Sequence, residues 1–173
     1  MDAHRNLIQS LAGGNGELVF KFFATFSGFE CALKRAHFVK GDRYNNAVPD
    51  WCGFADKLNG QLAAITDGDF IDAKTYLLQE PPKKQLFTKS DKRIRWKNNP
   101  RRGKESEEQY LLRLVRDVRN NLFHGGKYPS ADGGPVDGQM LRNSKLLEAC
   151  LSILDKCRSL HADIETFFEE ALQ

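Results

Sequence analysis

The stretch Arg119-Asn120-Asn121-Leu122-Phe123-His124-Gly125-Gly126 closes an amphipathic segment that begins after Ser106. Apolar side chains recur along this segment at helical spacing and form one narrow stripe: Leu111, Leu114, Val115, Val118 and Leu122. Ser106 is a favourable N-cap, and the two acidic residues that follow it suit the positive end of a helix dipole. Paired glycines end the pattern, as they commonly end helices. The segment therefore predicts a helix with one buried face and a polar C-terminus.

Residues 17–39 carry apolar side chains on two faces of a predicted helix. One stripe comprises Phe22, Phe26, Phe29 and Leu33, and the other comprises Phe20, Ala24, Cys31 and Phe38. A helix with two apolar faces packs either within one core or across an oligomer interface. Glu30 and Lys34 lie between the stripes, four residues apart, in the order that favours a local ion pair.

The rest of the chain also shows mainly helical periodicity. Pro49 and Asp50 mark a helix start, and Asp69 is a plausible N-cap for a short helix that ends at Leu78. Residues 138–172 form one helical pattern that would reach about 50 Å if unbroken, so this helix either bends or serves an interface. No segment predicts a strand convincingly. We expect an all-α fold: one domain over residues 1–173, a bundle of four to five helices, and a long C-terminal helix.

Composition limits the classes of function. With 173 residues, 40% of them hydrophobic and 28% charged, the chain is typical of an ordinary folded protein. Its four cysteines form no C-x-x-C pair and its four histidines no metal-binding spacing, so we expect neither a metal site nor a cofactor. Asp67, Asp69 and Asp72 lack the spacing of a calcium loop. No apolar run approaches the roughly 18 residues of a membrane span, and we expect a cytoplasmic protein.

Positive charge is concentrated in a segment at about residues 80–104, which we expect to be a basic insertion or loop. From Lys83 to Lys104 there are ten Lys or Arg residues and one acid, Asp91, although the net charge of the whole chain is only +3. Basic and aromatic side chains together can follow an RNA backbone and stack on a base. The candidate contacts are Lys92, Arg93, Arg95, Trp96, Arg101 and Arg102. A merely solvated loop, or a loop that meets an acidic antitoxin, would have the same composition.

Arg119, Asn120 and His124 are the residues best suited to catalysis. Cleavage of RNA by its own 2′-hydroxyl requires a base, an acid and cations that stabilise charge on phosphorus, and His and Arg can supply these without a metal. A helix C-terminus favours a protonated histidine by about 0.3–1 kcal/mol. Arg119 can hold two phosphate oxygens, and Asn120 can bind phosphate or orient the histidine.

Helical geometry separates the two principal residues. Five steps of about 100° place Arg119 and His124 roughly 140° apart around an ideal helix. Two copies of the helix that meet around a two-fold axis would bring both sets of residues together and supply two histidines. Arginine, asparagine and histidine are also common at helix C-termini for capping and charge reasons alone, so the spacing has a purely structural alternative.

The Arg119-Asn120-x-x-x-His124 pattern near a helix end, followed by another long helix, resembles the HEPN superfamily of nucleotide-binding domains. The family hallmark is R-x(4–6)-H with a polar residue, often Asn, after the arginine. Residues 26–34 are also similar to the first helix of stand-alone bacterial HEPN proteins. The resemblance implies a helical bundle, a homodimer around the motif, and a metal-independent endoribonuclease of toxin–antitoxin or antiphage systems. Arg119 and His124 would then be catalytic, with Asn120 and Glu30 in supporting roles.

One position departs from a subgroup of that family. HEPN toxins paired with a minimal nucleotidyltransferase carry a tyrosine two residues after the histidine, whereas this chain has Gly126 there and its nearest tyrosine is Tyr128. Regulation by that route does not fit the sequence. The expected partners are RNA, a second copy of the chain, and an antitoxin or other regulatory protein. The alternatives are a non-catalytic HEPN module that binds RNA, nucleotide or protein, and a plain helical interaction protein.

Overall fold

The computed structural model describes residues 15–90, 93–123 and 136–171. This part of the chain contains six α-helices: α2 Gly16–Arg35, α3 Trp51–Lys57, α4 Gly68–Gln79, α5 Glu107–Phe123, α6 Val136–Ser159 and α7 Ala162–Ala171. A 3-10 turn, η1, spans Leu62–Ala64. Two antiparallel hairpins accompany them: β1 Val39–Gly41 pairs with β2 Ala47–Pro49, and β3 Lys84–Thr88 pairs with β4 Arg93–Lys97. The fold is therefore mostly helical.

The expectation of an all-α bundle of four to five helices was wrong in two respects. The described chain has six helices, and it contains strands, although none was expected. The strands β1 and β2 have only three residues each, too few for a period-two pattern to stand out. In β4, by contrast, Ile94 and Trp96 alternate with basic residues. This alternation is typical of a strand, but the high density of charge in the segment favoured the expectation of a loop. The basic segment at about residues 80–104 is thus largely a hairpin rather than a loop.

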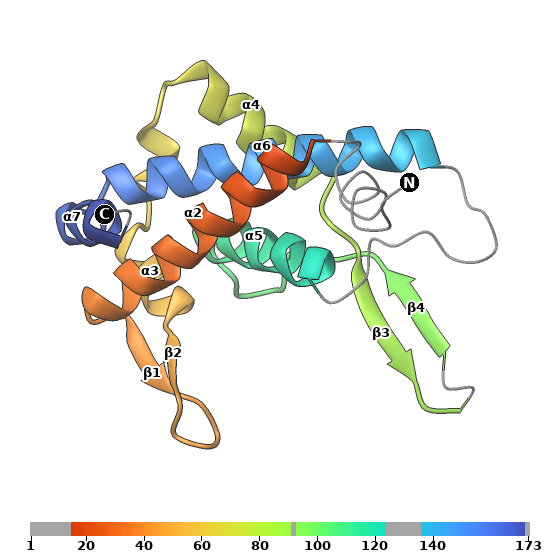
Figure 1. Ribbon diagram of the computed structural model, residues 1–173, viewed down its shortest axis with the longest axis horizontal. Helices are drawn as coiled ribbons and strands as arrows, with labels where there is room; N and C mark the ends of the chain where they lie inside the picture. Colours follow the sequence, from red (N-terminus) through yellow and green to blue (C-terminus); the bar gives the residue numbers. More distant parts are fainter. Residues whose placement is uncertain (1–14, 91–92, 124–135, 172–173) are drawn as a thin grey trace.

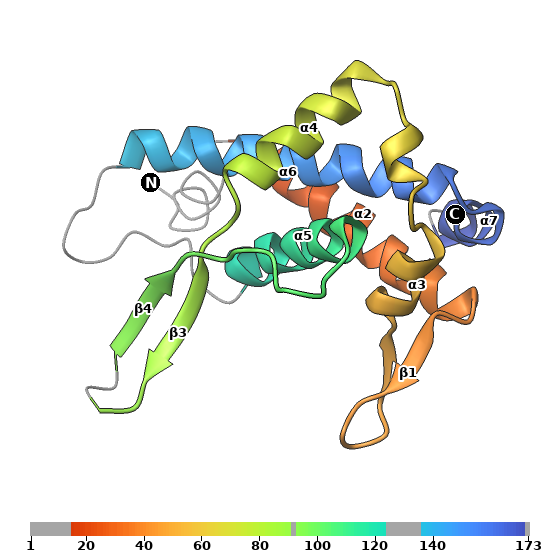
Figure 2. The same ribbon diagram turned by 180° about the vertical axis from the view of Figure 1, so that it is seen from behind.

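The helices form a layered body from which both hairpins project on the same side (Figures 1 and 2). Helix α4 packs along α6, while α2 packs against α6 and α7. Helix α5 contacts α3, α4 and α6, and also the base of β3. This arrangement places the helix that carries the arginine motif beside the basic hairpin.

The core is built from the stripes that the sequence predicts. Phe22, Phe29 and Leu33 of α2 are fully buried, and the predicted stripe of α5 is buried as well. The second stripe of α2 behaves differently, because Phe20 is 70% exposed while Phe38 is partly buried against the core. Among the described helices, none combines the length and the apolar character required to cross a bilayer.

The C-terminal helical pattern bends, which is one of the two alternatives expected from its length. The pattern over residues 138–172 is divided into α6 and α7 by a turn at Leu160 and His161. The ring of His161 lies edge-on to the rings of Phe38 and Phe54, with centroids 5.3 and 6.3 Å away. After the turn, α7 packs against α2 and buries Ile164 and Phe168.

The starts of α4 and α5 follow ordinary capping chemistry. The N-cap of α4 is Asp67, whose carboxylate accepts a hydrogen bond from the Phe70 amide at 3.0 Å, and not the expected Asp69. Ser106 caps α5 as predicted, since its Oγ accepts from the Gln109 amide at 3.1 Å and Gln109 Oε1 accepts from the Ser106 amide at 3.2 Å. This reciprocal capping box fixes where α5 begins.

Candidate functional site

Arg119 lies in the last turns of α5, against α2. Its guanidinium carbon is 5.6 Å from the centroid of the Phe26 ring, within the range of a cation–π contact. One Nη also donates a hydrogen bond to Asn120 Oδ1 at 3.1 Å. Asn120 is exposed, whereas Arg119 is partly buried. The structure thus holds the arginine between an aromatic face and the amide that follows it in the motif.

The Phe26 ring that contacts Arg119 belongs to a larger aromatic cluster. The rings of Phe26 and Trp51 stack with centroids 5.4 Å apart, and Phe29 stacks on Trp51 at 5.5 Å. The indole N–H of Trp51 donates to Glu30 Oε1 at 3.3 Å. Arg119 and Glu30, two of the predicted site residues, are therefore joined through the Phe26–Trp51 pair. Within the described chain Glu30 forms no ion pair with Lys34, so its partner is the indole rather than the expected lysine.

His124 and Lys92 lie outside the described residues. His124 follows Phe123, the last residue of α5, in the sequence. The structure therefore describes the arginine and the asparagine of the predicted motif, at the end of a helix as expected.

The basic hairpin carries three of the predicted RNA contacts. Arg93, Arg95 and Trp96 lie on β4, where Arg95 pairs with Leu86 and Trp96 with Gln85 across the ladder. Both arginines are exposed, and Trp96 is 44% exposed. An exposed indole next to Arg95 and Lys97 suits stacking on a base of single-stranded nucleic acid.

Both ends of the hairpin are fastened to α5. Asn121 is buried and its Nδ2 donates to the carbonyl of Lys83 at 2.7 Å, at the start of the hairpin. Beyond the hairpin, the buried amide of Asn99 donates to Asp117 at 2.8 Å, and its backbone carbonyl accepts from the Tyr110 hydroxyl at 2.8 Å. The motif helix and the hairpin are thus parts of one hydrogen-bonded unit.

Arg101 and Arg102 lie apart from the arginines of the hairpin, Arg93 and Arg95. Arg101 Nε donates to the carbonyl of Glu105 at 2.6 Å and so closes the turn before α5. Arg102 donates its backbone amide to the Glu105 carboxylate at 3.0 Å, and its side chain lines a pocket beside α3. The predicted RNA contacts that the structure describes therefore occupy two places, one on β4 and the other in the segment before α5.

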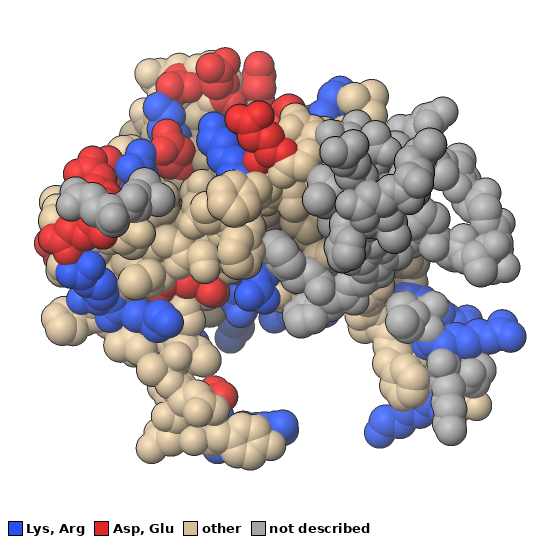
Figure 3. Space-filling view, in the orientation of Figure 1, with Lys and Arg blue, Asp and Glu red and all other residues tan. Residues whose placement is uncertain are grey.

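Charge is distributed unevenly over the molecular surface. Figure 3 shows Lys and Arg on the tips of both hairpins and on the underside of the helical layer between them. Asp and Glu gather mainly over α4 and near α7 in the same view. The side of the molecule from which the hairpins project is thus the one suited to a polyanion.

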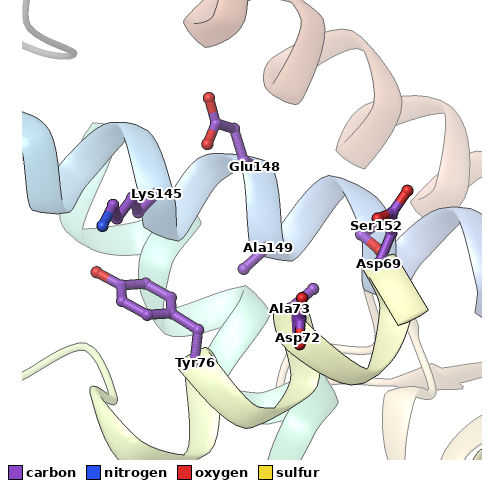
Figure 4. A pocket seen from close by; sticks show the side chains of 8 residues that line it. All are labelled: Asp69, Asp72, Ala73, Tyr76, Lys145, Glu148, Ala149 and Ser152. Carbon is purple, nitrogen blue, oxygen red and sulfur yellow. The ribbon is translucent and has the colours of Figure 1, made fainter.

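The charged residues that line a pocket of about 320 Å³ between α4 and α6 are mainly acidic. Asp69, Asp72 and Tyr76 reach it from α4, and Lys145, Glu148 and Ser152 from α6 (Figure 4). The third member of the aspartate trio, Asp67, caps α4 and pairs with Lys156 at 2.7 Å. Its pKa is lowered by the Lys156 ammonium and by the Phe70 amide. Among the described residues no group of His, Cys, Asp or Glu is arranged to hold a metal ion.

Comparison with known proteins yields no relative: no family model, no curated protein and no solved structure matches the chain. Residues of the site must therefore be judged by their chemistry alone. Phe26, Trp51 and Asn121 were assigned no role in the site from the sequence, although they hold Arg119 and the hairpin in place. The sequence offered one signal for Phe26, its membership of the buried stripe of α2.

Proposed function

We propose that this protein is a metal-independent endoribonuclease of HEPN type, in which Arg119 and His124 act on RNA. The observation that supports the proposal most strongly is the position of Arg119, which Phe26 and Asn120 hold near the end of α5, the helix that also packs against the basic hairpin. A guanidinium fixed in this way binds phosphate with little further loss of conformational entropy.

In the proposed reaction the RNA 2′-hydroxyl attacks the adjacent phosphorus. His124 of one protomer takes the proton from the 2′-oxygen, and the partner's histidine gives a proton to the departing 5′-oxygen. Arg119 stabilises the charge that gathers on the non-bridging oxygens. The products are a 2′,3′-cyclic phosphate and a 5′-hydroxyl. No metal or cofactor takes part in this scheme.

A homodimer fits the surface of α2. Phe20 is 70% exposed and Phe23 is 46% exposed on that helix, one to two turns before Phe26. Apolar surface of this kind favours association with a second copy, and its proximity to Phe26 would bring the two Arg119 side chains toward a common interface. Replacing Phe20 with Glu should shift the protein toward a monomer in sedimentation and lower any cleavage activity together with it.

The test is cleavage of a mixed RNA pool in EDTA by the wild type, Arg119→Ala and His124→Ala. We expect cleavage that survives chelation and falls by about 100-fold or more in each variant. If all three proteins bind RNA equally and none cleaves it, the nuclease proposal fails and a non-catalytic RNA-binding module takes its place. The exposed cations of β4 support that second function.

A further inference from the structure

A second concave site lies between α3 and the N-terminal half of α5. Its volume is about 350 Å³. Trp51 and Leu112, both buried, provide an apolar wall. The polar lining is mostly cationic, with Arg102, Lys104, Arg113 and Arg116. Cys52, an exposed free thiol, also lines the pocket.

The cations in this pocket exceed the acids available to neutralise them. Glu105 is the one carboxylate in the lining, and it is engaged by Arg113, whose Nε and Nη2 donate to it at 2.6 and 2.8 Å. This guanidinium holds the pKa of Glu105 below its usual range. Nearby Asp56 accepts from Gln109 at 2.7 Å. No ion pair within residues 15–90, 93–123 and 136–171 engages Arg102, Lys104 or Arg116.

Size and chemistry together define the ligand. Sites for small organic ligands start at about 300 Å³, so the pocket holds more than a bare ion. Guanidinium groups bind phosphate oxygens through two parallel hydrogen bonds, and a lysine adds a third point of charge. The buried wall of Trp51 and Leu112 would contact an uncharged part of the same molecule. We propose that this pocket binds a phosphate group attached to an organic moiety, as in a nucleotide.

The pocket adjoins the proposed ribonuclease site but does not depend on its activity. Arg116 precedes Arg119 by three residues, so the two project from neighbouring positions on the same side of α5. Trp51 is shared, since it lines the pocket and stacks on Phe26. The phosphate could come from a free nucleotide or from an RNA chain, because both present the same group.

Cys52 provides a reporter within the pocket itself. The test measures alkylation of each cysteine by N-ethylmaleimide with mass spectrometry, with the partly buried Cys31 as internal reference. The probes are adenosine 5′-monophosphate, adenosine, and a ten-nucleotide 2′-O-methyl RNA that cannot be cleaved through a 2′-hydroxyl. We expect the nucleotide or the RNA to slow alkylation of Cys52 but not of Cys31, and adenosine to have no effect. Protection by RNA alone would assign the phosphate to the RNA chain.

Substitutions distinguish binding in the pocket from attraction to positive charge elsewhere on the surface. Arg116→Ala should raise the concentration that gives half-protection by about tenfold or more, and Arg116→Lys should restore part of the loss. Lys21→Ala removes one exposed cation on α2 and should leave protection unchanged. The proposal is overturned if neither phosphate probe protects Cys52, or if adenosine protects it as well as adenosine 5′-monophosphate does. It is also overturned if Arg116→Ala and the wild type reach half-protection at the same probe concentration. Binding of the uncleavable probes is measured without catalysis, so failure of the nuclease proposal would leave this result standing.

Discussion

The amide of Asn121 donates a hydrogen bond to the backbone carbonyl of Lys83, 2.7 Å away and 38 residues earlier in the chain. This bond ties the residue after Asn120 to the start of the basic hairpin. Consecutive residues of one helix therefore supply the proposed RNA-binding side chains, Arg119 and Asn120, and the side chain that supports the hairpin, Asn121. Asn120 is exposed and Asn121 is buried, in keeping with these different roles.

Asn121→Ala should loosen the hairpin. The variant removes the buried amide that donates to the Lys83 carbonyl, which costs about 1 kcal/mol of unfolding free energy. Amide hydrogen exchange over residues 84–97 should become faster than in the wild type. Asn98→Ala, at an exposed neighbour of the hairpin, is the matched control and should change neither quantity. Equal exchange in the two variants would show that the Asn121 bond does not hold the hairpin.

Phe26→Leu should impair the proposed nuclease more than it impairs folding. Leucine fills most of the space of the ring, so the loss of unfolding free energy is about 1 kcal/mol. The cation–π contact that holds Arg119 is nevertheless lost, because leucine has no aromatic face. Phe22→Leu removes an equally buried ring one turn earlier on α2 and should cost similar stability with little effect on cleavage. Both are compared by thermal unfolding and by cleavage rate. Equal losses of rate would contradict a positioning role for Phe26.

The hairpin arginines should control the salt dependence of RNA binding. If Arg93 and Arg95 each contact one phosphate, replacing both with Gln should reduce the slope of log affinity against log salt by about 1.4 for single-stranded RNA. Lys21→Gln, which removes an exposed cation on α2, should leave the slope unchanged. Titrations at several salt concentrations decide the matter, and an unchanged slope in the double variant would remove β4 from the binding surface.

The Glu105–Arg113 pair should make stability depend on acidity. Arg113 lowers the pKa of Glu105, so the carboxylate stabilises the folded protein fully above the ordinary carboxyl pKa near 4.5, and this stabilisation is lost as the pH falls through the lower pKa of the folded state. Glu105→Gln should therefore cost about 2 kcal/mol near neutral pH and progressively less below pH 4.5. Glu107→Gln, in a more exposed pair with Lys74, should cost under about 1 kcal/mol. A pH-independent difference between wild type and Glu105→Gln would contradict this account.

Local patterns in the sequence predicted some elements well and others poorly. Helix α5, its Ser106 cap and its buried stripe follow from short-range periodicity, which packing then reinforced. The break before α7 brings His161 against Phe38 and Phe54, a contact between distant segments that no local pattern encodes. The same holds for the site, because the contact of Phe26 with Arg119 joins residues 93 positions apart. Residue type identified Arg119, but only the fold identified what holds it.

The most direct test of the central claim compares RNA with 2′-O-methyl RNA of the same sequence, in EDTA, with wild-type protein and His124→Ala. We predict that the wild type cleaves only the RNA and leaves 2′,3′-cyclic phosphate ends, because the attacking group is the 2′-hydroxyl. His124→Ala should cleave neither substrate. Cleavage of the 2′-O-methyl strand, or equal cleavage of RNA by the wild type and His124→Ala, would contradict the proposed mechanism.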